Sequence, residues 1–432
     1  MGTGRLVRTG STLVLVLAVA GCSGSAAQTP TQTPATGPTA SPTPSSTPTP
    51  SATVAPTPTP TAKPSPRPMA QVTLTPGPKM PQVRAGQAAV RLADGRVLMM
   101  GGSTLFTGKC EMMCMNPTTA SVEIYDPDTG KFSPFGSLTV PRTDGHALLL
   151  NDGRVLIVGG TGDWGGYLNT IEIFDPTRQV SVAVKPPADT QKLPADPTAV
   201  LLADGRVLLA AGSYDDAYTP SDATLVLDPA SGAFSTGPVM AEARFGAGAV
   251  LLTDGRVLIV GGNDSFGYFT YPNKYAEIID PSHPLAQSTM TLEEHPATST
   301  LLSDGRVLVT EFESGEAQCS PVPTVAEIFD PGSVCFAPAS PMNVPRSGSA
   351  VIATKDGRVL FIGGLDAKCA TTSTIEAFDP DSGTFQLVGT GFPDIRGFSM
   401  TLLDDGDILI AGAYGDFGNP PGMTAATWIL KP

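Results

Sequence analysis

The string Asp-Gly-Arg-Val-Leu recurs along the 432-residue chain, and it restricts the fold more than any other feature. Six copies begin at Asp94, Asp152, Asp204, Asp254, Asp304 and Asp356, and a degenerate copy, Asp-Gly-Asp-Ile-Leu, begins at Asp405. Successive copies are 58, 52, 50, 50, 52 and 49 residues apart. Periods near 50 residues are typical of propellers and solenoids. The chain therefore contains seven copies of one structural unit.

Each copy has the same internal pattern. An apolar run precedes Asp-Gly and a second one follows it, which predicts two strands joined by a two-residue type I′ hairpin turn. The second run ends in Gly-Gly in four copies, a third strand ends in Asp-Pro in six, and a fourth strand follows. These four antiparallel strands, named a to d, are the pattern of a propeller blade.

The two ends of the chain complement each other. The last copy stops after strand c, at Ile429-Leu430-Lys431-Pro432, and lacks strand d. The segment from Leu74 to Met80 lies at the offset from the first copy that strand d occupies elsewhere. We therefore expect an all-β, seven-bladed propeller closed by an N-terminal outer strand. A closed ring removes the exposed edges at which open sheets aggregate.

These motifs resemble kelch repeats: Gly-Gly after strand b, Glu-x-Tyr/Phe-Asp-Pro on strand c, and Arg just before strand a. The resemblance covers about residues 72–432, and bacterial proteins of this kind are similar to the central propeller of galactose oxidase. The sequence departs from the pattern at Glu311-Phe312, where Gly-Gly is expected, and at Ala211-Gly212 and Ala411-Gly412.

The N-terminal region predicts export and anchoring. Residues 1–21 have two basic residues and an apolar run of eight, as a signal peptide does. The following Val19-Ala20-Gly21-Cys22 resembles a bacterial lipobox, which implies lipidation of Cys22; an ordinary cleaved signal is the alternative. We expect a lipid-anchored protein on the outer face of a bacterial cell membrane, at the cell surface or on the periplasmic side.

Residues 22–70 form the predicted linker and residues 71–432 the propeller. Positions 23–70 contain 13 Pro, 12 Thr and 7 Ser, so this segment cannot bury enough apolar surface to fold and is expected to be a disordered stalk. Residues 1–70 contain four basic and no acidic residues, which leaves 22 basic and 40 acidic residues and a net charge of −18 beyond them. That charge argues against a nucleic-acid partner.

The loops predict where a ligand binds. In a four-stranded blade the b–c and d–a loops share one face, here the loop face, and the a–b and c–d turns share the other, the turn face. The length varies most in the b–c loops, and variable loops on a rigid scaffold usually carry binding. These loops contain Trp164, Tyr167, Tyr214, Asp215, Tyr218, Asn263, Asp264, Tyr268, Tyr414 and Asp416. Such aromatic and polar groups suit a sugar or protein ligand; the alternative is that the aromatic rings fill gaps between blades.

Arginines precede strand a near the predicted channel mouth, at Arg84, Arg142, Arg244, Arg346 and Arg396. In kelch domains that bind acidic peptides, arginines at this position contact carboxylates, so the resemblance implies ligand contacts. The alternative is that they pair with Asp163, Asp215, Asp264, Asp366 and Asp416 on the facing loops. Because Glu123, Glu172, Glu277, Glu327 and Glu376 recur on strand c, we expect them to be structural.

Catalysis has little support in the sequence. The three histidines, His146, His283 and His295, belong to separate predicted units, whereas the similar copper oxidases need two His and two Tyr on one metal. We expect no catalytic residue, no cofactor and no copper, with calcium at the Asp-rich face as the one metal the residue types suit.

The six cysteines leave several disulfide schemes open. Beside Cys22, we favour Cys319–Cys369 and Cys110–Cys114, with Cys319–Cys335 as the competing pair.

Taken together, these features predict a monomeric, non-catalytic binding module that recognises a protein or glycan through its loop face. The alternative is a carbohydrate-active enzyme similar to galactose oxidase or to kelch-type sialic-acid isomerases.

Overall fold

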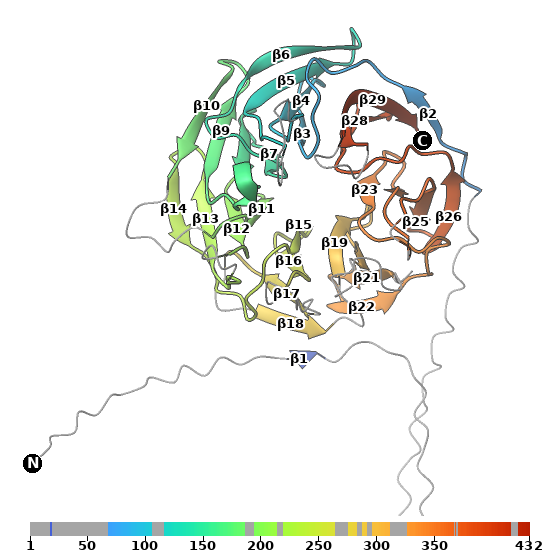
Figure 1. Ribbon diagram of the computed structural model, residues 1–432. Coiled ribbons are helices and arrows are strands. Elements are labelled where there is room, and N and C mark those ends of the chain that lie inside the picture. Colours follow the sequence, from blue (N-terminus) through green and yellow to red (C-terminus); the bar gives the residue numbers. More distant parts are fainter. Residues whose placement is uncertain are drawn as a thin grey trace, which may run out of the picture.

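The computed structural model describes residues 18–19, 68–105, 116–185, 194–213, 219–263, 275–282, 287–291, 296–311, 326–366, 368, 370–415 and 422–432. The described strands from residue 73 onward form seven four-stranded units arranged in a ring around a central opening (Figure 1). In each unit the strands are antiparallel, with strand a innermost and strand d at the rim. No helix in the described ranges is long and apolar enough to cross a membrane.

Units one to three follow the predicted strand order. Unit one contains β3 (Ala88–Arg91), β4 (Val97–Met100), β5 (Ser121–Asp126) and β6 (Lys131–Ser137). Unit two contains β7 (His146–Leu149), β8 (Val155–Val158), β9 (Ile171–Asp175) and β10 (Val180–Val184), with the 3-10 helix η1 (Asp163–Gly165) in its b–c loop. Unit three contains β11 (Thr198–Leu201), β12 (Val207–Ala210), β13 (Thr224–Asp228) and β14 (Ala233–Thr236).

Units four to six repeat this order. Unit four contains β15 (Gly248–Leu251), β16 (Val257–Val260), β17 (Tyr275–Ile279) and β18 (Gln287–Thr291); the two-residue β1 (Ala18–Val19) pairs in parallel with β18. Unit five contains β19 (Pro296–Leu301), β20 (Val307–Glu311), β21 (Ala326–Asp330) and β22 (Cys335–Pro338). Unit six contains β23 (Ala350–Ala353), β24 (Val359–Ile362), β25 (Ile375–Asp379) and β26 (Thr384–Gly389).

Unit seven joins the two ends of the folded region. It contains β27 (Ser399–Leu402), β28 (Ile408–Tyr414), β29 (Met423–Lys431) and, as its fourth strand, the N-terminal β2 (Thr73–Pro76). β2 pairs antiparallel with β29, with Leu74 opposite Leu430, which is where the sequence places the closing strand. Upstream of β2, the Val72 N–H donates to Val388 O of β26, so the same segment also ties unit seven to unit six.

The hydrophobic core lies between neighbouring units. Strands b are buried along their whole length because both faces of a blade pack against neighbours. One apolar cluster joins units one and two through Leu98, Ile124 and Phe174, and another joins units seven and one through Leu409 and Val97. Each cluster removes two apolar faces from water at once, which stabilises the ring by the hydrophobic effect.

The Asp-Gly hairpins differ from the expected two-residue type I′ turn. In unit one the loop runs from Leu92 to Arg96, the Gly95 N–H donates to Leu92 O, and Gly95 has a φ of 87° while Asp94 does not have a positive φ. This is a type I turn followed by a left-handed glycine, a common longer hairpin connection. The prediction was wrong because Asp-Gly occupies the third and fourth positions of the turn.

Candidate functional site

Four of the predicted ligand-binding arginines are buried inside the ring. Their guanidinium groups pair with the strand-c glutamates of their own units: Arg84 with Glu123 at 2.8 Å, Arg142 with Glu172 at 2.7 Å, Arg346 with Glu376 at 2.9 Å, and Arg244 with Glu277. None of the four arginines is more than 3% exposed. The prediction that they contact a ligand at the channel mouth is therefore wrong.

The alternative pairing with loop aspartates is also wrong where the structure describes it. Asp163 instead accepts hydrogen bonds from the N–H and hydroxyl of Thr118, both at 2.8 Å. Asp366 accepts hydrogen bonds from the N–H groups of Lys368 and Ala370 in its own loop. These two aspartates therefore accept hydrogen bonds from loop residues, and the buried arginines pair with the strand-c glutamates instead.

The glutamates also hold the segments that connect successive units. Glu172 accepts the N–H groups of Thr139 at 2.6 Å and Val140 at 2.9 Å, and the Ser181 hydroxyl at 2.8 Å. Burial pushes the pKa of Glu172 up, but these donors and Arg142 outweigh it, so the pKa lies below its usual range. Such charge-assisted bonds make the carboxylate a clamp on the connection between units one and two.

Unit one carries an incomplete version of this clamp. Glu123 accepts the Gln82 N–H at 3.0 Å, but Pro81, at the position of Thr139, has no N–H to donate. The Glu123 Oε2 atom is buried without a hydrogen-bond partner, and burial raises the pKa of Glu123.

Arg396 is one residue out of register with the other arginines. It forms a bridge with Tyr414, as Ala85 does with Ser103, so Ile395 stands at the position of Arg84. Trp428 pairs with Ile410 where Glu123 pairs with Met99. Unit seven thus replaces the ion pair with apolar side chains, and Arg396 itself is half-buried. Its role in ligand binding stays a prediction.

The predicted aromatic loop residues are only partly described. Tyr167, Asn263 and Tyr414 are half-buried and form isolated bridges with Thr161, Phe245 and Arg396. The side chain of Trp164 lies outside the described part of the structure, as do Tyr214, Asp215, Tyr218, Asp264, Tyr268 and Asp416.

The favoured disulfide pairs do not account for Cys335. Cys335, which the favoured pairs leave over, is disulfide-bonded. Its partner lies outside the described residues, as do Cys22, Cys110, Cys114, Cys319 and Cys369. The bond is compatible with the competing pair Cys319–Cys335.

Two aspartates that the sequence reasoning missed lie at the loop-face end of the inner strands. Asp144 in unit two and Asp196 in unit three have φ values of 57° and 49°. Both stand eight residues before the Asp-Gly turn, a position that four other units fill with glycine at φ values of 60° to 66°: Gly86, Gly246, Gly348 and Gly397. A left-handed backbone is costly for most residues with a side chain, and Asp is among the few that adopt it, so these two units place a carboxylate where four others have glycine.

Their surroundings form the candidate site, which we call the carboxylate mouth: Asp144, Asp196 and the exposed His146 at the start of β7. The Asp144 N–H donates to Gly86 O at 2.7 Å, and Asp196 Oδ1 accepts the Gly160 N–H at 2.8 Å, so each residue is anchored to the preceding unit. Asp144 is exposed to solvent at the mouth, and partial desolvation of its carboxylate together with the nearby Asp196 raises its pKa, against the Thr143 hydroxyl and His146. The signal in the sequence was Asp in place of a repeated Gly.

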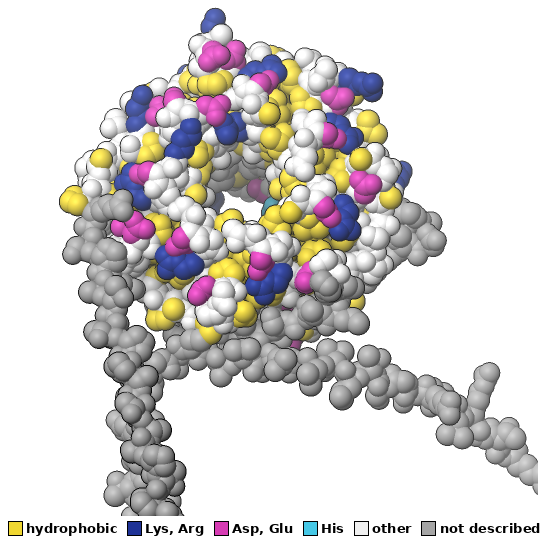
Figure 2. Space-filling view, turned by 180° about the vertical axis from the view of Figure 1, so that it is seen from behind, with side chains coloured by type: hydrophobic (Ala, Val, Ile, Leu, Met, Phe, Trp, Pro, Cys, Tyr) yellow, Lys and Arg dark blue, Asp and Glu magenta, His cyan; other side chains and the backbone are white. Residues whose placement is uncertain are grey.

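The described residues contain no group of three or more His, Cys, Asp or Glu side chains placed to hold a metal ion. On the turn face, basic and acidic side chains lie next to one another around the opening (Figure 2). There each Asp-Gly-Arg arginine pairs with its own aspartate, for example Arg206 with Asp204. The turn face is therefore repetitive and internally neutralised, whereas the loop face differs from unit to unit.

Comparisons with known proteins agree with this architecture. Residues 142–185 match the family model of the kelch motif. A fungal alcohol oxidase of the AA5 family, solved in complex with copper, has a TM-score of 0.61 and 16% identity over 83% of this chain and 76% of its own. The structure of YjhT has a TM-score of 0.51 and 12% identity over 72% of this chain and 99% of its own. A search of curated proteins finds no match. The described residues from 68 onward therefore have the fold of a β-propeller, and residues 142–185 match a kelch motif.

Proposed function

We propose that this propeller is a non-catalytic recognition module whose ligand binds at the carboxylate mouth. The observation that carries the proposal is the pair of aspartates at positions where the ring otherwise uses glycine. Residues held in disfavoured backbone conformations cluster at ligand clamps and active sites, where function offsets the strain.

The chemistry of the mouth favours a ligand with ammonium, guanidinium or hydroxyl groups. Carboxylates accept hydrogen bonds from all three and attract the first two electrostatically. The net charge of −18 beyond residue 70 adds a long-range attraction for cations. Burial of Arg84, Arg142, Arg244 and Arg346 removes the reason to expect an acidic peptide. We therefore propose a basic protein surface or a glycan as the partner.

The position of the N-terminal strand β2 supports an orientation in which the loop face points away from the membrane. β2 begins opposite Lys431, at the end of a strand c, and strands c end at the turn face. A tether that precedes β2 therefore joins the ring on the turn face. With anchoring through Cys22 and a stalk over residues 22–70, both of which we propose from the sequence, the loop face would point away from the membrane.

The test uses the full chain on glycan arrays and on arrays of basic and acidic peptides. Asp144→Gly combined with Asp196→Gly should abolish binding and preserve the fold, because glycine is the residue of the other units at this φ. Gln179→Gly, at a φ of 60° on a turn-face loop, is the matched control and should bind like the parent. Undiminished binding by the double variant, or stoichiometric copper in the purified protein, would overturn the proposal.

A further inference from the structure

On the turn face, arginines connect neighbouring units. The Nη2 of Arg154 donates to Pro229 O at 2.8 Å, that of Arg256 to Pro331 O at 3.1 Å, and that of Arg306 to Pro380 O at 2.8 Å. In each case the acceptor belongs to the c–d turn of the next unit. These bonds link units two, four and five to their successors.

At the junction of units six and seven this acceptor is missing. Unit seven has no c–d turn, because β29 runs to the end of the chain and β2 supplies the fourth strand. The guanidinium of Arg358 in unit six bonds only to Asp356 within the described part, with Nε to Oδ2 at 2.7 Å. Arg96 and Arg206 also lack a proline acceptor among the described residues, although a c–d turn follows each of them.

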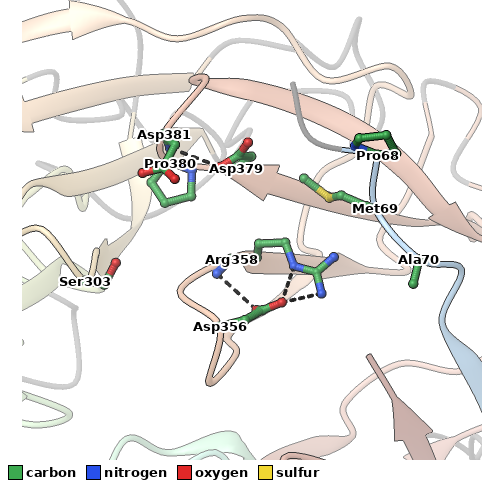
Figure 3. Close-up of a pocket in the computed structure, with 9 residues that line it drawn as sticks. All are labelled: Pro68, Met69, Ala70, Ser303, Asp356, Arg358, Asp379, Pro380 and Asp381. Atoms are coloured by element: carbon green, nitrogen blue, oxygen red, sulfur yellow. Dashed lines mark hydrogen bonds and ion pairs between the residues drawn. The ribbon is translucent and has the colours of Figure 1, made fainter. Parts of the chain in front are cut away.

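A pocket of about 300 Å³ lies beside Arg358 (Figure 3). Its walls come from the a–b turns of units five and six, the c–d turn of unit six, and residues 68–70, which precede β2. The lining residues are Pro68, Met69, Ala70, Ser303, Asp356, Arg358, Asp379, Pro380 and Asp381. The pocket therefore opens at the point where the N-terminal segment meets the ring.

The walls define the chemistry of an occupant. Arg358 can donate to a backbone carbonyl, as its counterparts do to Pro229, Pro331 and Pro380. Asp356 is paired with Arg358, and Asp379 is buried and accepts the Asp381 N–H and the Ser382 hydroxyl. The lining therefore has an excess of negative charge that favours a basic side chain. Pro68, Met69 and Pro380 supply apolar surface, which suits the rings of a polyproline II segment.

We propose that this pocket binds a basic, proline-rich segment, and that its occupant is Lys63-Pro64-Ser65-Pro66-Arg67 of the same chain. Arg67 is joined by a peptide bond to Pro68, which lines the pocket, so the segment is within reach of the pocket. The four charged residues of positions 1–67 are all basic, and two of them lie in this segment. The site is on the turn face and is independent of ligand binding at the carboxylate mouth.

Occupancy would fix the direction in which the linker leaves the ring and would cover the junction of units six and seven. The test is zero-length carbodiimide crosslinking of the full chain, which joins an amine to a carboxylate only when the two are in contact. Peptide mass spectrometry should find Lys63 joined mainly to the carboxylates of the pocket, Asp381 above all.

Matched variants distinguish binding of the segment in the pocket from non-specific attraction of Lys63 to the acidic surface. Asp381→Asn removes the reacting carboxylate, so the Lys63–Asp381 crosslink should disappear, and the Lys63 crosslinks to Asp356 and Asp379 should fall by up to roughly five-fold, the effect of one exposed ion pair. Arg358→Gln should also reduce them, although it leaves every carboxylate in place. Asp128→Asn is the control, because Asp126-Pro127-Asp128 of unit one repeats the string Asp379-Pro380-Asp381. Equal crosslinking to Asp128 and Asp381, or no effect of Arg358→Gln, would overturn the proposal.

Mixing the protein with a copy uniformly labelled with nitrogen-15 identifies the source of the segment. A crosslink within one chain joins two peptides that are both labelled or both unlabelled, and finding only such pairs would support binding of the segment of the same chain. Mixed pairs would mean that a second copy occupies the pocket, which would overturn it.

Discussion

The clamp glutamates allow a matched comparison between two units of one molecule. Glu172→Gln leaves Arg142 buried opposite a neutral group and turns an amide N–H toward the donors of Thr139 and Ser181. Removing one partner of a buried ion pair costs about 3–5 kcal/mol. We expect Glu172→Gln to lower the free energy of unfolding by an amount in this range.

Glu123→Gln should cost less, although Glu123 is nearly as buried as Glu172. Its Oε2 atom has no donor to lose, and Arg84 keeps bonds to Gly101 O and to Ser121. Each hydrogen bond to a charged acceptor contributes about 1.5–3 kcal/mol, and Glu172 has two more of them. We therefore expect the two substitutions to differ by about 2 kcal/mol or more.

The pH dependence of the two costs should also differ. The pKa of Glu172 is lowered on folding, so its contribution is complete above its unfolded pKa of about 4.3 and is lost only as the pH falls below it. The pKa of Glu123 is raised, so the folded state binds a proton more readily than the unfolded state. Between pH 7 and 4.5 the cost of Glu172→Gln should stay constant, while that of Glu123→Gln should grow as the pH falls.

Urea unfolding followed by circular dichroism, at several pH values, measures both costs. The linear extrapolation requires that the slope with urea is the same for parent and variants. Equal costs at pH 7, or a larger cost for Glu123→Gln, would refute the claim that the donors from the connecting segment set the strength of the clamp.

Three further changes test other parts of the fold. Pro81→Thr should supply the missing donor to Glu123 and raise the melting temperature, because a charge-assisted bond of about 1.5–3 kcal/mol exceeds the roughly 0.4–1 kcal/mol lost with proline; calorimetry that shows no rise would count against this. Gln179→Gly should stabilise by up to about 1 kcal/mol in urea unfolding, because its φ is 60°, and a loss of stability would contradict it. Deletion of residues 68–76 should expose the edge of β29 and give oligomers by light scattering, whereas an intact monomer would show that β2 is dispensable.

Much of the fold follows from the repeat alone. Asp-Gly at intervals near 50 residues, apolar runs on both sides, and Asp-Pro after strand c predict the strand order of each unit, and the missing last strand predicts the pairing of β2 with β29. The turn type was wrong because the string Asp-Gly is the same in both hairpin classes. Only the register of the strands on either side, which end at Arg91 and resume at Val97, distinguishes them.

The candidate site was harder to predict, because the fate of an arginine depends on a partner far along the chain. Arg84 precedes Glu123 by 39 residues and Arg142 precedes Glu172 by 30, since the b–c loop between them varies in length. No fixed spacing therefore reveals the pair. Arg396 differs from the other four arginines in its spacing, because it precedes its Asp-Gly turn by nine residues and they precede theirs by ten.

Comparison of the units with one another gives the missing information. Four units have both Arg and Glu at the clamp positions, whereas unit three has Pro194 and Leu225, and unit seven has Ile395 and Trp428. Units three and seven have lost both partners together, as expected for a buried ion pair, because either partner alone would be an uncompensated buried charge. In the sequence, unit five has glutamate at both of the corresponding positions, Glu294 and Glu327.

Pairs of positions that change together between units belong to the scaffold. Positions that change alone, against the backbone preference of the other units, are the candidates for function. By this criterion Asp144 and Asp196 stand out, because they keep the left-handed backbone of this position without its glycine. The same criterion assigns Arg84, Arg142, Arg244 and Arg346 to the scaffold, where the structure buries them.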